Sequence, residues 1–253
     1  MDFKEKFKFS LCSKKNKFLL KSLRFPITIT IGIHDTEYIN VDHKQVQLKF
    51  GKNSHYQIFS GSSQIFKNPV HGLIVCAREK PIQEEWLKDY IQNVQVSENL
   101  TVDLPVSYIP SFNSENRIFS LSGRLRSGNA KWMSPTTFIN SDCAELVLFN
   151  PNFTPDVYEN FVSKWLNSGS TRLDYVQCLP KPRYELSNFD RFPTKPWDKT
   201  QRAKDYIIPD GGYMDCSEGL DIVRSDGMLA TIVDSMKAFY FVVWKNRFPV
   251  SRS

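Results

Sequence analysis

Hydrophobic and polar residues alternate strictly soon after the start of the chain. Between residues 27 and 33 every second position is isoleucine, which is the period of a β-strand with one buried face. Residues 46–50 repeat the alternation more briefly, and residues 72–76 form a continuous apolar run, which is typical of a strand buried on both faces. Apolar residues at helical spacing follow from 86 to 94. This part of the chain is therefore predicted to begin a small sheet and then to form a strand, a helix and a strand.

A second strand-helix-strand unit is predicted between residues 145 and 178. Residues 146–149 are expected to form a strand, and Thr154 is suited to cap a helix with Pro155 at its first position. Gly169 is expected to end that helix, and residues 173–176 to begin the next strand. A unit of this length normally forms a right-handed crossover between parallel strands.

The spacing of the predicted strands leaves two architectures open. Short apolar strands are expected to start near residues 46, 73, 100, 121, 146 and 173. Leucine-rich repeats have periods of about 20–29 residues, and Leu173, Tyr175 and Cys178 have the outline of the strand in such a repeat. An ordinary α/β layer made of short units gives similar intervals. The predicted fold class is α/β, either with a leucine-rich-repeat-like curved sheet or as an ordinary layer, with an N-terminal helix and small β-hairpins.

The C-terminal third begins with a connector and ends in strands. Residues 180–212 carry five prolines with little periodicity, so an extended connector is expected. Two apolar segments, 220–223 and 229–232, flank Asp226 and Gly227, a dipeptide suited to a tight turn with positive φ. Residues 239–244 are expected to add a third strand, because an isolated hairpin is marginally stable.

The net charge of +6 belongs to the first 24 residues. They hold eight Lys and Arg against Asp2 and Glu5, so the other 25 basic side chains are matched by 25 acidic ones. Phe7, Leu11 and Phe18 share one face of a predicted amphipathic helix in this segment, with lysines opposite. A nucleic-acid binder needs a basic stripe on its folded surface, so binding of RNA or DNA through this helix is the third-ranked hypothesis.

The composition is that of a folded intracellular protein, either cytoplasmic or nuclear. No stretch approaches the roughly 20 consecutive apolar residues of a membrane span, and the N-terminus has no secretory signal pattern. Five cysteines without a C-x-x-C pair argue against a disulfide framework.

The sequence contains no pattern that indicates catalysis. Its four histidines precede residue 72 and lack metal-ligand spacing, and there is no phosphate-binding loop or nucleophile elbow. Cys76 and Cys143 lie in apolar surroundings, where a thiol is usually inert. We therefore expect neither an enzyme, nor a cofactor, nor a metal.

Three stretches of the chain resemble the F-box-associated type 2 family of nematodes. Residues 9–15 and 20–23 look like the last helix of an F-box. The middle and closing motifs of the family match Asn140, Cys143, Phe161, Trp165, Arg172, Leu173, Asp221, Arg224, Asp226 and Gly227. The chain departs from the family at residues 168–171, which read Ser-Gly-Ser-Thr, and has no counterpart of the first F-box helices before Phe7.

The resemblance implies a non-catalytic protein-interaction module. Such a module would recognise a substrate protein for a cullin-type ubiquitin ligase, with Phe7, Leu11, Leu19 and Leu23 as contacts to the Skp-type adaptor. The family-motif residues are expected to be mainly structural. The alternative is an orphan or decoy binding protein that recruits no ligase, because the F-box is truncated.

A repeat-like sheet would present certain strand residues to the target. Glu145, Val147, Asp174 and Gln177 lie between the apolar strand positions and would face a partner, or alternatively would be ordinary solvent-facing strand residues. The predicted organisation is an F-box remnant at 1–24, a β-rich then strand-helix-strand segment at 25–104, an F-box-associated core at 105–180, and a connector with a hairpin at 181–253.

Overall fold

One large sheet organises the part of the chain that the computed structural model describes. The described residues are 28–33, 38–41, 44–47, 70–77, 84–93, 95–114, 117–179, 189–234 and 238–249. Within them, twelve strands pair in the order β3-β2-β1-β4-β5-β6-β7-β8-β14-β13-β12-β9, and a separate hairpin pairs β10 with β11. The predicted α/β fold class with small hairpins is confirmed.

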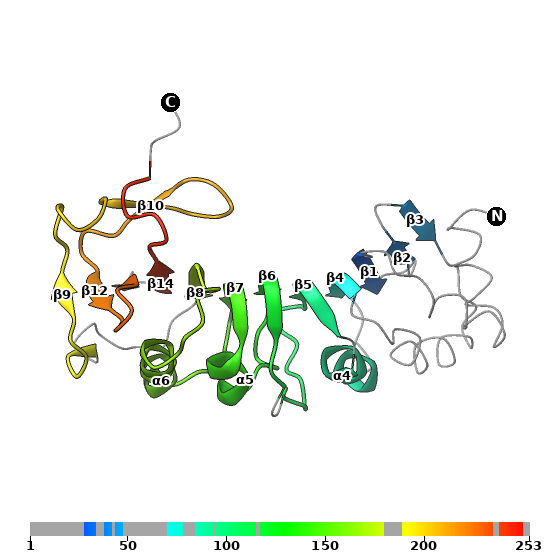
Figure 1. Cartoon of the computed structure of the whole chain (residues 1–253). Helices are drawn as coiled ribbons and strands as arrows, with labels where there is room; N and C mark the ends of the chain where they lie inside the picture. Colours follow the sequence, from blue (N-terminus) through cyan, green and yellow to red (C-terminus); the bar gives the residue numbers. More distant parts are fainter. Residues whose placement is uncertain are drawn as a thin grey trace.

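Six neighbouring strands of the sheet are parallel and lie in sequence order (Figure 1). They are β1 (Thr28–Ile33), β4 (Val70–Ala77), β5 (Val96–Asp103), β6 (Ser120–Ser127), β7 (Asp142–Phe149) and β8 (Tyr175–Leu179). The short antiparallel strands β2 (Tyr38–Val41) and β3 (Lys44–Gln47) extend the sheet beyond β1. The predicted parallel crossover between residues 146–149 and 173–176 is present as the β7–β8 pair.

The three described helices lie on the same face of the sheet (Figure 1). They are α4 (Glu84–Asn93), α5 (Pro135–Asn140) and α6 (Pro155–Leu166). Sequence-ordered parallel strands with helices on one face are arranged as in a repeat protein, whereas a doubly wound layer has helices on both faces. We call the sheet surface opposite these helices the far face.

Local sequence explains where the two helices beside β7 begin. Ser134 caps α5 by accepting a hydrogen bond from the Thr137 amide, and Pro135 occupies the first turn. Thr154 caps α6 with extended backbone, although its side chain makes no capping bond. The helix ends at Leu166 with Asn167 as its C-cap, so the expectation that Gly169 ends it is wrong. The chain leaves the helix at Asn167, two residues before Gly169, and the Asn167 backbone N–H donates to the carbonyls of Ser163, Lys164 and Trp165.

The C-terminal strands continue the same sheet. β14 (Phe239–Val243) pairs antiparallel with β8 and with β13 (Leu229–Asp234), which pairs with β12 (Leu220–Val223). The Asp226-Gly227 turn is present, with Gly227 at a φ of 85°. The Gly227 amide donates to the Arg224 carbonyl and the Arg224 amide to the Met228 carbonyl, which is a three-residue loop with glycine in the left-handed position. The sheet runs without interruption past the boundaries expected at 104 and 180.

Part of the expected connector packs on the sheet. After β9 (Lys195–Pro196), residues 197–219 form the β10 (Asp205–Ile207) and β11 (Tyr213–Asp215) hairpin and fold over the far face of the C-terminal strands. We call residues 197–219 the covering segment. Its Cys216, Tyr206 and Met214 pack with Val147, Tyr175 and Trp244. The expectation of an extended connector is therefore wrong for these residues, because buried contacts hold them on the sheet.

Two hydrophobic clusters result, one on each side of the sheet. The larger cluster joins the apolar face of α6 to strand residues such as Leu146, Leu148 and Val176. The smaller cluster lies between the far face and the covering segment. None of the described helices combines the length and apolar character that crossing a membrane requires.

Candidate functional site

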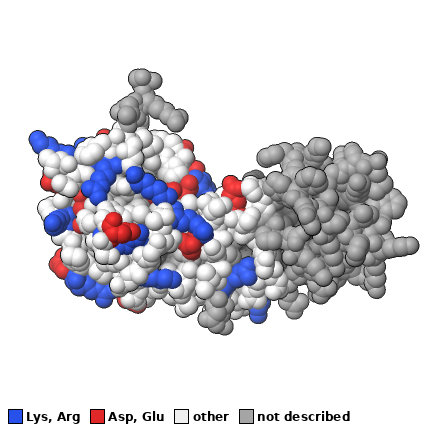
Figure 2. Space-filling model, viewed as in Figure 1, with Lys and Arg blue, Asp and Glu red and all other residues white. Residues whose placement is uncertain are grey.

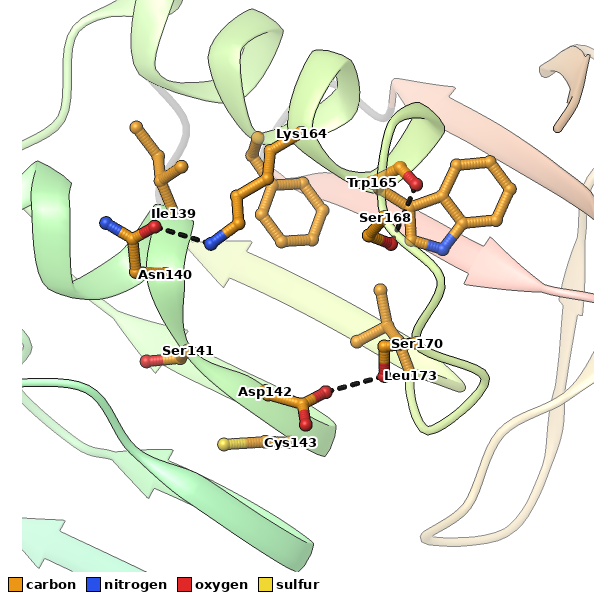
Figure 3. Close-up of a pocket in the computed structure, with 11 residues that line it drawn as sticks. Ile139, Asn140, Ser141, Asp142, Cys143, Lys164, Trp165, Ser168, Ser170 and Leu173 are labelled. Carbon is orange, nitrogen blue, oxygen red and sulfur yellow. Dashed lines mark hydrogen bonds between the residues drawn. The ribbon is translucent and has the colours of Figure 1, made fainter. Parts of the chain in front are cut away.

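A cavity of about 100 Å³ opens between α5, α6, the start of β7 and the loop before β8 (Figure 3). Parallel strands begin at the same edge of a sheet, so the first residues of β7 and the loop that leads into β8 meet there. The cavity is lined by Ile139, Asn140, Ser141, Asp142, Cys143, Phe161, Lys164, Trp165, Ser168, Ser170 and Leu173.

The rim of the cavity is polar. Lys164 donates from its ammonium to the amide oxygen of Asn140, which links α6 to the end of α5 (Figure 3). The Ser170 hydroxyl donates to the Asp142 carboxylate at 2.7 Å. The Ser168 hydroxyl donates to the Trp165 carbonyl at 2.9 Å. These bonds hold the loop before β8 against α6 and the start of β7.

The walls of the cavity are apolar. Phe161, Trp165, Leu173 and Cys143 are all buried. Burial raises the pKa of the Cys143 thiol to about 12, so the thiolate is rare at neutral pH. The thiol lies 3.7 Å from the Phe119 carbonyl oxygen, to which it donates a weak hydrogen bond. This cysteine is consequently a wall of the cavity and a poor nucleophile.

Trp165 combines deep burial with an unsatisfied donor. Only 5% of the residue is exposed, and its indole N–H has no hydrogen-bond partner among the described residues. The Arg224 guanidinium lies 5.1 Å from the centre of the indole ring, a cation–π distance. The ring is therefore held firmly, and its N–H is buried without a hydrogen-bond partner among the described residues.

Arg224 connects the C-terminal turn to the cavity. It is 2% exposed and donates to the Ser168 hydroxyl at 3.2 Å and to the Ser170 carbonyl at 2.8 Å. Its other nitrogens bind both carboxylate oxygens of Asp226, at 3.0 and 2.6 Å. The hydrogen bond from Arg224 is the main cause that lowers the pKa of Asp226 to about 2. The β12–β13 turn thus braces the loop that forms one wall of the cavity.

Arg172 braces the opposite side of the same loop. Its guanidinium donates to the Asp142 carbonyl at 2.9 Å and to the Ser120 hydroxyl at 2.8 Å. It also lies 3.0 Å from the Asp142 carboxylate. One side chain therefore ties the residue before Leu173 to the first residues of β6 and β7.

The structure brings most of the predicted motif residues together. Asn140, Cys143, Phe161, Trp165 and Leu173 line the cavity, while Arg172, Arg224, Asp226 and Gly227 belong to its supports. Asp221 is elsewhere, buried under the covering segment, where it pairs with Arg202 at 2.9 Å and accepts from the Thr231 hydroxyl at 2.7 Å.

Several residues of the cavity and of the buried Arg202–Asp221 pair were not predicted from the sequence. Asp142, Ser168 and Ser170 line the cavity, and Ser168 and Ser170 fall where the chain departs from the family pattern. For Ser168 and Ser170, the signal in the sequence was their position within this departure from the family pattern. Arg202 is fully buried, yet it comes from a proline-rich stretch without periodicity, so no local pattern marks it.

The predicted partner-facing residues have different surroundings. Val147 is 3% exposed, so its placement on an accessible partner face is wrong: the covering segment buries it. Glu145 pairs with Arg124 at 2.5 Å, and Gln177 accepts from the Tyr175 hydroxyl at 3.2 Å. Asp174 precedes β8 and pairs with Lys245.

An accessible part of the far face lies on β5 and β6. Asn99, Asp103 and Arg126 are exposed there, and Thr101 is half-buried. Thr101 of β5 is the register partner of Arg126 of β6, and Arg126 is in turn the register partner of Val147 of β7. Asp210, at the tip of the β10–β11 hairpin, lies 3.7 Å from Arg126 and also pairs with Arg124. This border marks where the covering segment stops.

Charged groups of both signs are interspersed on the described surface. Figure 2 shows basic and acidic side chains side by side over the C-terminal strands and the covering segment. The described residues contain no group of three or more metal-ligating side chains. Phe7, Leu11, Leu19 and Leu23, the predicted adaptor contacts, lie outside the described residues, as does the N-terminal helix.

Two nematode proteins are similar to this chain. The uncharacterized protein F59B2.9 of Caenorhabditis elegans is 29% identical over 168 residues, and the uncharacterized protein F59B2.8 of the same organism is 31% identical over 134 residues. These matches cover 61% and 49% of this chain but only 39% and 31% of the two relatives. No family model and no solved structure matches the chain.

Proposed function

We propose that the chain is a non-catalytic protein-binding module whose target docks on the far face over β5 and β6. The observation that carries this proposal is an accessible sheet surface with a defined border. Asn99, Asp103 and Arg126 are exposed on it, and the covering segment meets it at Arg126, where Asp210 lies 3.7 Å away. The tip of the covering segment borders this surface on one side, where Asp210 pairs with Arg124.

The chemistry of this surface suits a protein partner. Its side chains are short and polar or carry a charge, and Arg126 keeps 44% of its side chain exposed while stacking 5.6 Å from the Phe149 ring. Arginine held against an aromatic ring is presented with little conformational freedom, and arginine is enriched at binding hot spots. The described thiols at Cys143, Cys178 and Cys216 are buried and have raised pKa values, which also favours a binding role over catalysis.

Partner capture with a charge reversal on each face tests the proposal. Proteins enriched from a nematode extract by the wild-type chain should be lost with Arg126→Glu and retained with Lys88→Glu. Lys88 is an exposed residue of α4 and gives the same charge change on the helix side. Equal enrichment by both variants would remove the far face from consideration, and thermal unfolding should be nearly unchanged in each because both residues are exposed.

The further proposal that the module serves a cullin-type ligase rests on the family resemblance. A direct binding assay with the Skp-type adaptor tests it, with a version extended by a complete F-box as positive control. Binding by the 253-residue chain supports the ligase-adaptor role. Binding by the extended version alone favours a detached recognition module, the orphan or decoy alternative.

A further inference from the structure

Two arginines of the far face already hold a carboxylate of the chain itself. The β10–β11 hairpin extends from the C-terminal strands toward β6, and Asp210 lies at its tip (Figure 1). One carboxylate oxygen of Asp210 lies 2.5 Å from an Arg124 nitrogen, and the other lies 3.7 Å from an Arg126 nitrogen. The arginines are separated by one residue of β6, so both side chains project from the same face of the sheet. They present two guanidiniums, groups that bind carboxylates strongly.

The two arginines are held in place by contacts other than Asp210. Arg124 donates from Nε to a Glu145 carboxylate oxygen at 2.5 Å, and its Nη2 lies at the same distance from that oxygen. The Arg126 guanidinium lies 5.6 Å from the centre of the Phe149 ring. Departure of Asp210 would therefore leave both guanidiniums in position, and a site that is organised in advance binds a ligand at a smaller entropic cost.

The tip of the hairpin is loosely attached to the sheet. Residues 209–212 are all exposed, and 54% of the Asp210 side chain is accessible. A Cβ added at Gly211 or Gly212 would meet no atom within 4 Å, so neighbouring side chains do not pack there. Among the described residues, Asp210 makes the hydrogen bond and the ion pairs that join the tip to the sheet. Exposed ion pairs contribute little stability, so a competing carboxylate can displace this one.

A carboxylate from outside can bind Arg126 better than Asp210 does. The separation of 3.7 Å is too long for a hydrogen bond, and the Arg126 guanidinium makes none with any described residue. Its planar set of donors is suited to two parallel bonds with one carboxylate. Arg124 and Arg126 are balanced by Glu145 and Asp210, while Asp103, also exposed on this surface, pairs with neither arginine. Departure of Asp210 therefore leaves one positive charge for the incoming group.

We propose that the protein that docks on the far face presents an aspartate or glutamate side chain, which replaces Asp210 at Arg124 and Arg126. The tip of the β10–β11 hairpin is then a built-in competitor. A target with a carboxylate at the right place displaces it, whereas a target without one does not. This inference rests on the proposed function and specifies the chemistry of the partner, which is an acidic protein segment.

A peptide titration followed by NMR tests the preference for carboxylates. The probe is triglutamate with acetylated and amidated ends, and triglutamine is its neutral control. The backbone amide signals of Arg124 and Arg126 report binding at this site and not at the basic residues 1–24, which also attract an acidic peptide. Triglutamate should shift these signals saturably, and about threefold less peptide should suffice in Asp210→Asn, because the competing ion pair is gone.

Two further variants complete the titration. Asp205→Asn makes the same charge change at an exposed residue at the start of the hairpin and should bind triglutamate like the wild type. Arg126→Gln should bind it about tenfold more weakly, as expected for loss of hydrogen bonds to a charged group. Thermal unfolding should be nearly unchanged in these variants, because the substituted side chains are exposed. Equal affinity of the wild type and Asp210→Asn for triglutamate overturns the proposal, and so does an equal response to triglutamine.

Partner capture separates this inference from the proposed function. Asp210→Asn should retain the nematode proteins at a higher salt concentration than the wild type, and the double variant Asp210→Asn/Arg126→Glu should lose them. If Arg126→Glu loses proteins that Lys88→Glu keeps, but Asp210→Asn holds them no more tightly than the wild type, the far face binds a target without displacement of Asp210 and this inference alone fails. If Arg126→Glu and Lys88→Glu capture the same proteins, the docking face itself is wrong.

Discussion

The two faces of the sheet are covered by different kinds of layer. On the helix side, α6 and α5 bury aromatic rings against one another and the sheet, with ring centres of Phe138 and Phe161 4.9 Å apart and those of Tyr158 and Phe239 4.6 Å apart. On the far face, the irregular covering segment is held by fewer apolar contacts and by the fully buried Arg202. The helix layer is thus held mainly by apolar contacts, whereas the covering segment is held both by apolar contacts and by a buried ion pair, the polar anchor.

The polar anchor is unusually complete. The Arg202 Nε lies 2.9 and 3.0 Å from the two carboxylate oxygens of Asp221. Its other nitrogens donate to the carbonyls of Ala203 and Cys216, and its guanidinium lies 4.8 Å from the Trp244 ring centre. Because every part of this side chain has a specific partner, the position tolerates substitution poorly.

The largest effect is expected from breaking this anchor. Arg202→Met should lower the free energy of unfolding by about 3–5 kcal/mol, because it leaves the buried Asp221 carboxylate without its cation. Urea denaturation provides the measurement, and limited proteolysis should show cleavage within 205–215 before the rest of the chain. The double variant Arg202→Met/Asp221→Leu should recover part of the loss, since no buried charge remains. Equal stability of Arg202→Met and wild type would contradict the anchor.

Adjacent residues on β7 allow a matched comparison of the two faces. Leu146 is fully buried on the helix side, and Val147 is buried under the covering segment. Leu146→Ala should cost about 3 kcal/mol and Val147→Ala about 2 kcal/mol, in proportion to the carbon atoms removed and the cavities left. The unfolding transitions should also differ: Leu146→Ala should shift the whole transition, whereas Val147→Ala should chiefly increase proteolysis of the covering segment. Identical patterns would mean that both layers unfold together.

The smallest effect concerns the turn that braces the cavity. The pKa of Asp226 is lowered to about 2 by the hydrogen bond from Arg224, below the unfolded value of about 3.9. Its contribution to stability is therefore fully present above about pH 5 and is lost as the pH falls through about 2. The stability difference between the wild type and Asp226→Asn should shrink over this range in acid unfolding experiments. A difference that is independent of pH would show that the charge of Asp226 does not act through Arg224.

The elements that sequence predicted are those with local signals. α6 follows from Thr154, Pro155 and the repeated apolar positions, and the β12–β13 turn from Asp226-Gly227. α5 was missed although Ser134 and Pro135 mark its start, because six residues are too few to establish a helical period.

The cavity and the covering segment depend on contacts distant in sequence. The motif residues between Asn140 and Leu173 were identified by their order, but their meeting point depends on parallel pairing of β7 with β8. The bond from Arg224 to the Ser170 carbonyl spans 54 residues, and the Arg202–Asp221 pair spans 19. No periodicity in a single sequence encodes such pairs.

The short strand β9 also affects how copies of the protein behave toward one another. Lys195 and Pro196 pair with β12 and form one edge of the sheet. Proline has no N–H to offer an incoming strand, and a lysine at an edge disfavours stacking of a second chain. Among the described strands these two residues of the connector form the outer edge on this side, and they disfavour growth by strand addition, the process that leads to aggregation.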